Sequence, residues 1–208
     1  MNPRTQKLRF TGAAGVIEAL RDDPAEGMAP RGTAVIAHPH PLFGGTMDNK
    51  VVQTLARAFV QTGWTAIRFN FRGVGASEGA HDEGLGEAQD MLGLVGQVAP
   101  EGPLALAGFS FGGFVTTHVV ANLWPQRAIE RLVLVGTSVV RSAPAAVPVD
   151  LHERTLVVHG EQDDTVPLSA VMDWARPQLL PVTVIPGVEH FFHGQLPLLK
   201  SLVARHLR

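Results

Sequence analysis

The chain has 208 residues, of which 45% are hydrophobic, and a formal net charge of −2. This length favours one domain over residues 1–208 with a large apolar core, and the lack of any long Lys/Arg run makes nucleic acid and anionic membranes unexpected partners. The chain has no cysteine, which excludes disulfides, thiolate metal ligands and a cysteine nucleophile. No stretch is as apolar as a membrane span or a signal peptide, so we expect a cytoplasmic protein.

Short apolar strands alternate with helices along the chain. Two β-like segments, 5–12 and 15–22, predict an N-terminal hairpin. After the hairpin, further strands are predicted at 33–38, 64–71, 104–108, 132–135, 155–159 and 182–185. Helices are predicted at 48–62, 83–98, 111–124, 167–174 and 196–207, and Asp48 is the expected N-cap of the first. Strands that are apolar on both faces are typical of a parallel sheet between two helical layers. The sequence therefore predicts an α/β fold with an open, mostly parallel sheet of about eight strands, helices on both faces and an antiparallel N-terminal hairpin.

Polar residues that could perform chemistry follow four of the predicted strands. They are the His38–His40 segment, Ser110, Asp163 and His190. In open parallel sheets the functional site lies beyond the carboxyl ends of the strands. We therefore expect these side chains to share one crevice.

The pentapeptide Gly108-Phe109-Ser110-Phe111-Gly112 lies between a predicted strand and a predicted helix. A sharp turn from strand to helix exposes a serine at its tip, and glycines two residues to either side avoid collisions there. The chain contains 22 glycines, so the spacing alone has a chance expectation of roughly a few per cent. Its position between strand and helix is what indicates that Ser110 is a nucleophile.

A serine nucleophile needs a base, and the base needs a group that orients it. His190, after the last predicted strand, is the candidate base, and Asp163, after the preceding strand, is the candidate orienting carboxylate. The histidines that compete with His190 are His38, His40, His159 and His193, and His159, at the end of a buried strand, is expected to be structural. The carboxylate that competes with Asp163 is its neighbour Asp164, which is expected at the surface or at a helix cap.

The chain order Ser110, Asp163, His190 and the Gly-x-Ser-x-Gly turn resemble the α/β-hydrolase superfamily. Three further segments resemble its acid loop, its glycine turn and its oxyanion loop: 159–167 (HGEQDDTVP), 71–79 (FRGVGASEG) and 38–45 (HPHPLFGG). The resemblance implies a catalytic triad and favours His190 and Asp163 over their neighbours. The short length and the His-Pro-His-Pro sequence are most similar to small, lidless carboxylesterases or dienelactone-hydrolase-like members. Dienelactone hydrolases proper use a cysteine nucleophile, which this chain lacks.

The resemblance also implies an oxyanion hole made of two backbone N–H groups. Phe111, which follows the nucleophile, should supply one of them. The other should come from the loop after strand 33–38. Pro39 and Pro41 have no N–H, so His40 is the best candidate donor and Leu42 the next.

The segment between Gly136 and Thr155 is too short for a cap domain, so we expect an open site. An open site excludes little water, which favours small esters or thioesters cleaved through an acyl-enzyme. Leu42, Phe43 and Phe191 are the candidate substrate contacts, although such phenylalanines more often serve packing. Amide or peptide cleavage, C–C bond hydrolysis and a non-catalytic binding protein on the same scaffold are the alternatives.

No cofactor is expected. A metal site at His38 and His40 is disfavoured because a proline separates them and Asp48 is the only nearby carboxylate. The Gly73-Val74-Gly75 turn lacks the third glycine of a dinucleotide loop, since Glu78 occupies that position. Arg72, in the same turn, is expected to hydrogen-bond the backbone.

Overall fold

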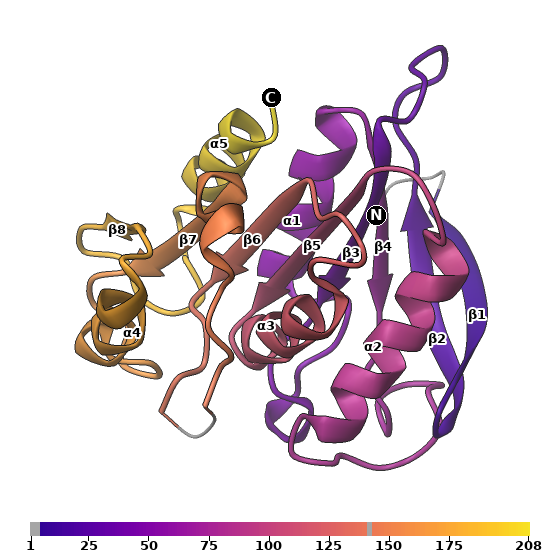
Figure 1. Cartoon of the computed structure of the whole chain (residues 1–208), viewed down its shortest axis with the longest axis horizontal. Coiled ribbons are helices and arrows are strands. Elements are labelled where there is room, and N and C mark those ends of the chain that lie inside the picture. The colour runs from indigo at the N-terminus through magenta and orange to yellow at the C-terminus, as the bar shows by residue number, and fades with distance from the viewer. Residues whose placement is uncertain (1–4, 141–142) are drawn as a thin grey trace.

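The computed structural model describes residues 5–140 and 143–208. In these residues eight strands form one sheet in the spatial order β1-β2-β4-β3-β5-β6-β7-β8 (Figure 1). The strands are β1 (Gln6–Gly12), β2 (Gly15–Asp22), β3 (Gly32–Ala37), β4 (Trp64–Phe69), β5 (Leu104–Phe109), β6 (Arg131–Val135), β7 (Thr155–Gly160) and β8 (Val182–Ile185). The helices are α1 (Lys50–Gln61), α2 (Leu85–Val98), α3 (Phe111–Leu123), α4 (Leu168–Ala175) and α5 (Leu196–His206), with short 3-10 turns η1 (Pro41–Phe43), η2 (Val149–Arg154) and η3 (Arg176–Gln178).

The strand directions decide where a site can form. β1 pairs antiparallel with β2, and β2 pairs antiparallel with β4. The remaining neighbours, from β4 across the sheet to β8, pair in parallel. This confirms the predicted α/β fold with a hairpin at one end of a mostly parallel sheet. The carboxyl ends of β3, β5, β7 and β8 consequently share one edge, where ligands bind in open α/β sheets.

Helices cover both faces of the sheet (Figure 1). The face under α2 and α3 holds one apolar cluster, to which Val35 and Leu106 belong. The opposite face, under α1 and α5, holds a second cluster that includes Ile36 and Ala107. Consecutive residues of β3 and β5 thus enter different clusters, and both faces of these strands are buried. This burial is why the strands have continuous apolar sequences.

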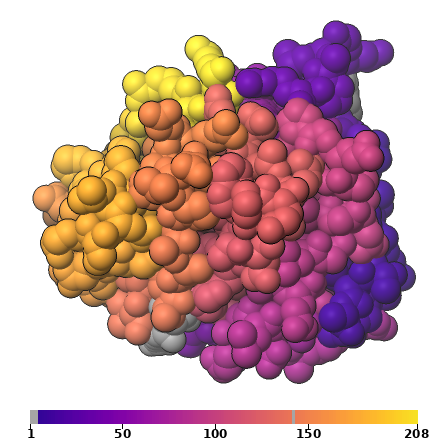
Figure 2. Space-filling view, viewed as in Figure 1, coloured from indigo at the N-terminus to yellow at the C-terminus, as the bar shows by residue number. Residues whose placement is uncertain are grey.

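The segment between β6 and β7 adds no separate domain above the site. Among its described residues, η2 is the one regular element. Figure 2 shows the described residues of the segment lying on the surface between α3 and α4. Residues 141 and 142, inside the irregular segment 138–150, lie outside the described residues. The fold is therefore lidless, as the short segment predicted.

The start of α1 differs from the sequence prediction. Asn49, not Asp48, caps the helix, because its side chain accepts a hydrogen bond from the N–H of Val51 at 2.9 Å. Asp48 instead accepts from the buried guanidinium of Arg68, at 3.2 Å from Nη1. The other predicted element boundaries lie within two residues of those observed.

Candidate active site

The turn between β5 and α3 holds Ser110 in an unusual backbone conformation. Its φ and ψ are 55° and −118°, a region that residues with a Cβ rarely occupy and that costs about 1–3 kcal/mol. Backbone hydrogen bonds on both sides fix the turn: Ser110 N–H donates to the carbonyl of Val135 at 2.9 Å, and Ser138 N–H donates to the carbonyl of Ser110 at 3.0 Å. The strain is thus held in place by the neighbouring strand β6, and the serine side chain is fixed at the strand tip.

The two glycines of the turn are required by close backbone contacts. A Cβ on Gly108 would lie 2.3 Å from the carbonyl oxygen of Gly112. A Cβ on Gly112 would lie 2.4 Å from the carbonyl oxygen of Ala37, at the end of β3. Real Cβ atoms do not approach backbone that closely, so the turn requires glycine at 108 to close on itself and glycine at 112 to pack against the end of β3.

We expect Gly112→Ala to destabilise the protein by about 1–3 kcal/mol, because the new methyl group must push the turn away from β3. Gly96→Ala is the matched control. Gly96 lies in α2 with open space around its Cα, so alanine there should stabilise the helix by about 0.5–1 kcal/mol. Urea unfolding of both variants measures the difference, and equal free energies of unfolding would contradict the packing argument.

Three side chains from three loops meet at this turn. His190 Nε2 lies 3.0 Å from the Oγ of Ser110, and His190 Nδ1 lies 2.6 Å from Oδ2 of Asp163. A carboxylate oxygen accepts, so Nδ1 carries the hydrogen and Nε2 is free to accept the serine hydroxyl hydrogen. All three residues are buried. The structure therefore joins the predicted serine, histidine and aspartate in one hydrogen-bonded chain.

The Asp163 carboxylate is oriented by its own loop. Its Oδ1 accepts hydrogen bonds from the N–H groups of Thr165 at 3.0 Å and Val166 at 2.7 Å. These two bonds leave Oδ2 facing His190. The neighbouring Asp164 is exposed and lies at the edge of the cleft rather than against the histidine.

The His190 ring is held by groups that the sequence interpretation did not assign to it. The ring of Phe109 lies beneath it, with centroids 4.9 Å apart and planes inclined by 34°. A Cβ on Gly136 would come within 3.2 Å of His190 Cε1. The positive φ of Gly136, 50°, keeps the strand end clear of the ring. A glycine directly after an apolar strand was the signal that could have identified this contact.

The alternative base His193 is not part of this chain of bonds. Its side chain is 71% exposed and its Nδ1 lies 3.0 Å from Glu189 Oε1. The backbone N–H of His193 also donates to Glu189, at 2.6 Å. His193 is therefore paired at the surface, whereas His190 is buried against Ser110.

The loop after β3 is organised by His38. Its ring is fully buried, with Nδ1 2.6 Å from the carbonyl oxygen of Pro39 and Nε2 accepting from Phe71 N–H at 3.0 Å. Both nitrogens are thus used by backbone, which leaves none for a metal. Burial lowers the pKa of His38 from 6.5 to about 4, so the ring is neutral at physiological pH.

We expect the stability of the protein to fall as pH drops from about 6.5 towards 4. In this window the unfolded chain protonates His38 and the folded protein does not, so acid favours unfolding. The shift in pKa corresponds to roughly 3 kcal/mol at its full extent. His38→Gln, which retains an acceptor for Phe71, should show a shallower decline in the free energy of unfolding over the same pH range. Identical pH profiles for the two proteins would contradict this origin.

The next residues of the loop shape the candidate oxyanion hole. The N–H of Leu42 donates to Nδ1 of the His40 side chain at 3.3 Å, and the carbonyl oxygen of His40 accepts from Phe43 N–H and Gly45 N–H. The His40 ring lies 4.8 Å from the ring of Phe111, the residue after Ser110. The side chains of the two predicted donor residues, which come from different loops, are therefore in contact.

A cleft of about 690 Å³ opens above Ser110 and His190. Its apolar walls include Phe43, Phe111, Val140, Val166, Pro167 and Phe191. Among its described lining residues, Asp164 is the one Asp, Glu, Lys or Arg. Leu42, a predicted substrate contact, is 69% exposed and is not among these lining residues, whereas Phe43 and Phe191 are.

Arg72 does not bond the backbone as predicted. Its Nε donates to Asp90 Oδ2 at 2.7 Å, and its Nη1 lies 3.7 Å from Asp82. The pair with Asp90 ties the glycine turn to α2, and Asp82 lies in the segment before that helix. Within residues 5–140 and 143–208, no group of three or more His, Asp or Glu side chains is arranged to hold a metal ion, and no helix there is long and apolar enough to cross a membrane.

Comparison with known proteins identifies similar chains. Residues 40–154 match a family model described as the alpha/beta hydrolase fold. A lidless α/β serine hydrolase from Xanthomonas campestris is 33% identical, with a TM-score of 0.87 over 100% of this chain and 95% of that one. An α/β serine hydrolase homologue from Coxiella burnetii is 36% identical, with a TM-score of 0.84 over 98% of this chain and 97% of that one.

Two further matches bear less weight. An uncharacterised protein of Rickettsia prowazekii is 37% identical over 118 residues, which is 55% of this chain. The match spans about half the length of that curated relative, 49%. The esterase Est1E of Butyrivibrio proteoclasticus, solved with ferulic acid, has a TM-score of 0.79 over 95% of this chain and 96% of its own, but at 17% identity it shows the fold alone.

Proposed function

We propose that this chain, which belongs to the α/β-hydrolase family, cleaves small carboxylic esters or thioesters through an acyl-enzyme. One observation carries the proposal: the Asp163–His190–Ser110 hydrogen-bond chain ends at a strained serine that lines an apolar cleft. A serine hydroxyl is a weak nucleophile without such a base. The same chain of bonds provides the base and its orientation.

In the first half of the reaction the Ser110 Oγ attacks the carbonyl carbon of the ester. His190 Nε2 takes the hydroxyl proton as the new C–O bond forms, and Asp163 stabilises the resulting imidazolium through Nδ1–H. Collapse of the tetrahedral intermediate breaks the bond to the alcohol or thiol, which receives the proton from His190. The acyl group is then bonded to Ser110.

In the second half a water molecule replaces the alcohol. His190 takes its proton while the water oxygen attacks the acyl carbon, and then returns the proton to Ser110 as the acyl–enzyme bond breaks. The products are the carboxylic acid and the regenerated serine.

The oxyanion that forms in each half-reaction needs two donors. We assign them to the backbone N–H groups of Phe111 and His40. Leu42, the alternative donor in the loop, already donates to the His40 side chain at 3.3 Å. The contact between the His40 and Phe111 rings supports a common position for the two donor residues.

The cleft favours small, uncharged acyl groups. Its walls are mostly apolar, and the lidless fold leaves one side open to solvent. Phe43 and Phe191 are 70% and 42% exposed, so they can contact a bound acyl or aryl group. An open site contacts little of a long acyl group, and turnover should therefore decline as the acyl group lengthens.

The test is a screen of purified protein against nitrophenyl esters of increasing acyl length, aryl esters and acyl-CoA thioesters, with fluorophosphonate labelling in parallel. We expect labelling at Ser110 and the highest kcat/KM for short acyl esters. Folded protein that resists the fluorophosphonate would contradict the hydrolase proposal and favour a binding protein on this scaffold.

A further inference from the structure

A second buried histidine lies behind the catalytic carboxylate. His159, near the end of β7, is fully buried. Its Nε2 lies 2.8 Å from the carbonyl oxygen of Val166. A carbonyl oxygen can only accept, so Nε2 carries the ring hydrogen and donates it.

This bond closes the turn that orients Asp163. Val166 donates its N–H to Asp163 Oδ1 at 2.7 Å, and its carbonyl oxygen accepts from His159 at 2.8 Å. The residue is therefore held at both of its backbone polar groups. If the carbonyl were released, Val166 could rotate and its N–H would leave the carboxylate.

The first half of the same loop is fixed by other contacts. Glu161 N–H donates to the carbonyl of Ile185 at 3.0 Å, and Gln162 N–H donates to the carbonyl of Val188 at 2.9 Å. These bonds dock the start of the loop against the segment that leads to His190. The second half of the loop, the turn from Asp163 to Val166, is the part to which the His159 bond is made.

His159 also approaches the carboxylate itself. Its Nε2 is 3.5 Å from Asp163 Oδ2, the oxygen that accepts from His190 Nδ1 at 2.6 Å. Burial lowers the pKa of His159, while the nearby Asp163 opposes that shift and His190 adds to it. Because the His159 ring is neutral, it forms no charged pair with Asp163, and the carboxylate remains available to stabilise the His190 imidazolium.

The other ring nitrogen of His159 gains nothing from this position. Its Nδ1 is buried, with no hydrogen-bond partner among the described residues. A buried acceptor without a partner destabilises the fold. The hydrogen-bonding contribution of the ring therefore comes from Nε2 and its bond to Val166.

From this geometry we propose that His159 is a positioning residue, which fixes the Asp163–Val166 turn and through it the contact between Asp163 and His190. The proposal rests on the function proposed above. It assigns His159 no proton transfer and no contact with substrate.

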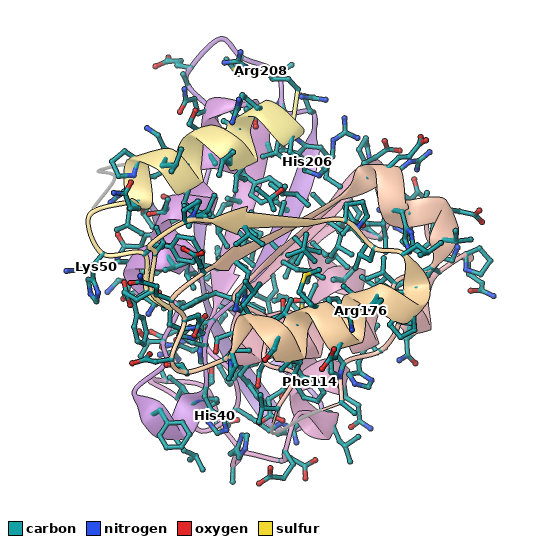
Figure 3. The ribbon with its side chains drawn as sticks, turned by 90° about the vertical axis from the view of Figure 1, so that its left-hand side faces the viewer. His40, Lys50, Phe114, Arg176, His206 and Arg208 are labelled. Atoms are coloured by element: carbon teal, nitrogen blue, oxygen red, sulfur yellow. The ribbon has the colours of Figure 1, made fainter. Side chains whose placement is uncertain are left out.

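The test compares variants that remove the Nε2 donor with one that restores it. His159→Leu removes the donor. His159→Asn keeps a polar side chain, but its amide is too short to reach the Val166 oxygen, and it replaces His159→Leu in the test if that variant does not fold. His159→Gln places an amide nitrogen near the position of Nε2. The matched control is His206→Leu, because the half-buried His206 ring also lies with its Nε2 close to a backbone oxygen, that of Arg154 at 3.0 Å. His206 lies at the far side of the molecule from His40 (Figure 3).

The first measurement is the rate of fluorophosphonate labelling at Ser110, which needs no knowledge of the natural substrate. We expect His159→Leu and His159→Asn to slow it about 10- to 100-fold, the size of effect that a small misplacement of a catalytic group produces. His159→Gln should recover most of the rate. His206→Leu should keep the wild-type rate even where it lowers the melting temperature.

The second measurement uses the best ester from the screen. The donor-removing variants should lose kcat with KM nearly unchanged, and the acidic limb of their pH profile should move to lower pH because the His190 imidazolium loses support from Asp163. Folded His159→Leu or His159→Asn with wild-type labelling and an unmoved limb would overturn the positioning role while leaving the hydrolase standing. A wild-type protein that is not labelled at all would remove both proposals.

Discussion

Ser110→Ala is expected to lower kcat for ester hydrolysis by a factor of roughly 10³–10⁶. The variant leaves His190 and Asp163 in place but removes the atom to which the acyl group would be bonded. The residual rate would reflect water attacking a substrate held by the oxyanion donors. KM should change little, because the hydroxyl contributes to the reaction and not to the walls of the cleft.

The control for this variant is Ser201→Ala, which removes an exposed hydroxyl on α5. It should retain full activity and full labelling. A stopped-flow assay with a nitrophenyl ester adds a second readout, since the wild type should release a burst of nitrophenol and Ser110→Ala should not. Hydrolysis at an undiminished rate by folded Ser110→Ala would remove the acyl-enzyme mechanism.

Much of the candidate site could be predicted because, in a parallel sheet, residues that directly follow different strands lie near one another. Ser110, Asp163 and His190 each follow a strand of the parallel sheet, and parallel strands end at one edge. A residue just after a strand is thus placed without knowledge of its side-chain contacts. The glycines around Ser110 were predictable for a related reason, since they reflect a backbone contact that every such turn makes.

The residues that support the triad could not be predicted in the same way. The contact of Phe109 with His190 depends on the twist of the sheet and on a side-chain rotamer. His159 was expected to be structural, and its burial agrees with that, but its bond to Val166 depends on the path of a loop. Such contacts join residues through geometry that no local pattern encodes.

The start of α1 shows how a local rule can choose the wrong neighbour. Asp48 and Asn49 are both good capping residues, and sequence spacing cannot separate them. The decision comes from Arg68, a buried cation on β4 that binds the carboxylates of Asp22 and Asp48. Asn49 is therefore the side chain that accepts the hydrogen bond from the Val51 N–H in the first turn of the helix.

The second large effect is expected at His40, where the proposed role belongs to the backbone and not to the ring. His40→Pro removes the N–H that we assign to the oxyanion hole and should lower kcat about 10²–10³-fold, the usual loss for one such donor. The φ of His40 is −53°, within the range of proline, so the substitution can be made without rotating this bond.

His40→Ala is the matched control, because it keeps the N–H while removing the same ring. Both variants lose the ring contacts with Phe43 and Phe111 and the acceptor for Leu42 N–H. Any loss of activity from those contacts therefore appears in both, and the ratio of their kcat values isolates the backbone donor. We expect alanine to retain activity within about tenfold of the wild type, since its remaining donor matches the usual oxyanion arrangement. Equal losses in the two variants, with both folded by circular dichroism, would show that the ring and not the N–H matters. The comparison separates a donor that stabilises the transition state from a side chain that merely shapes the loop.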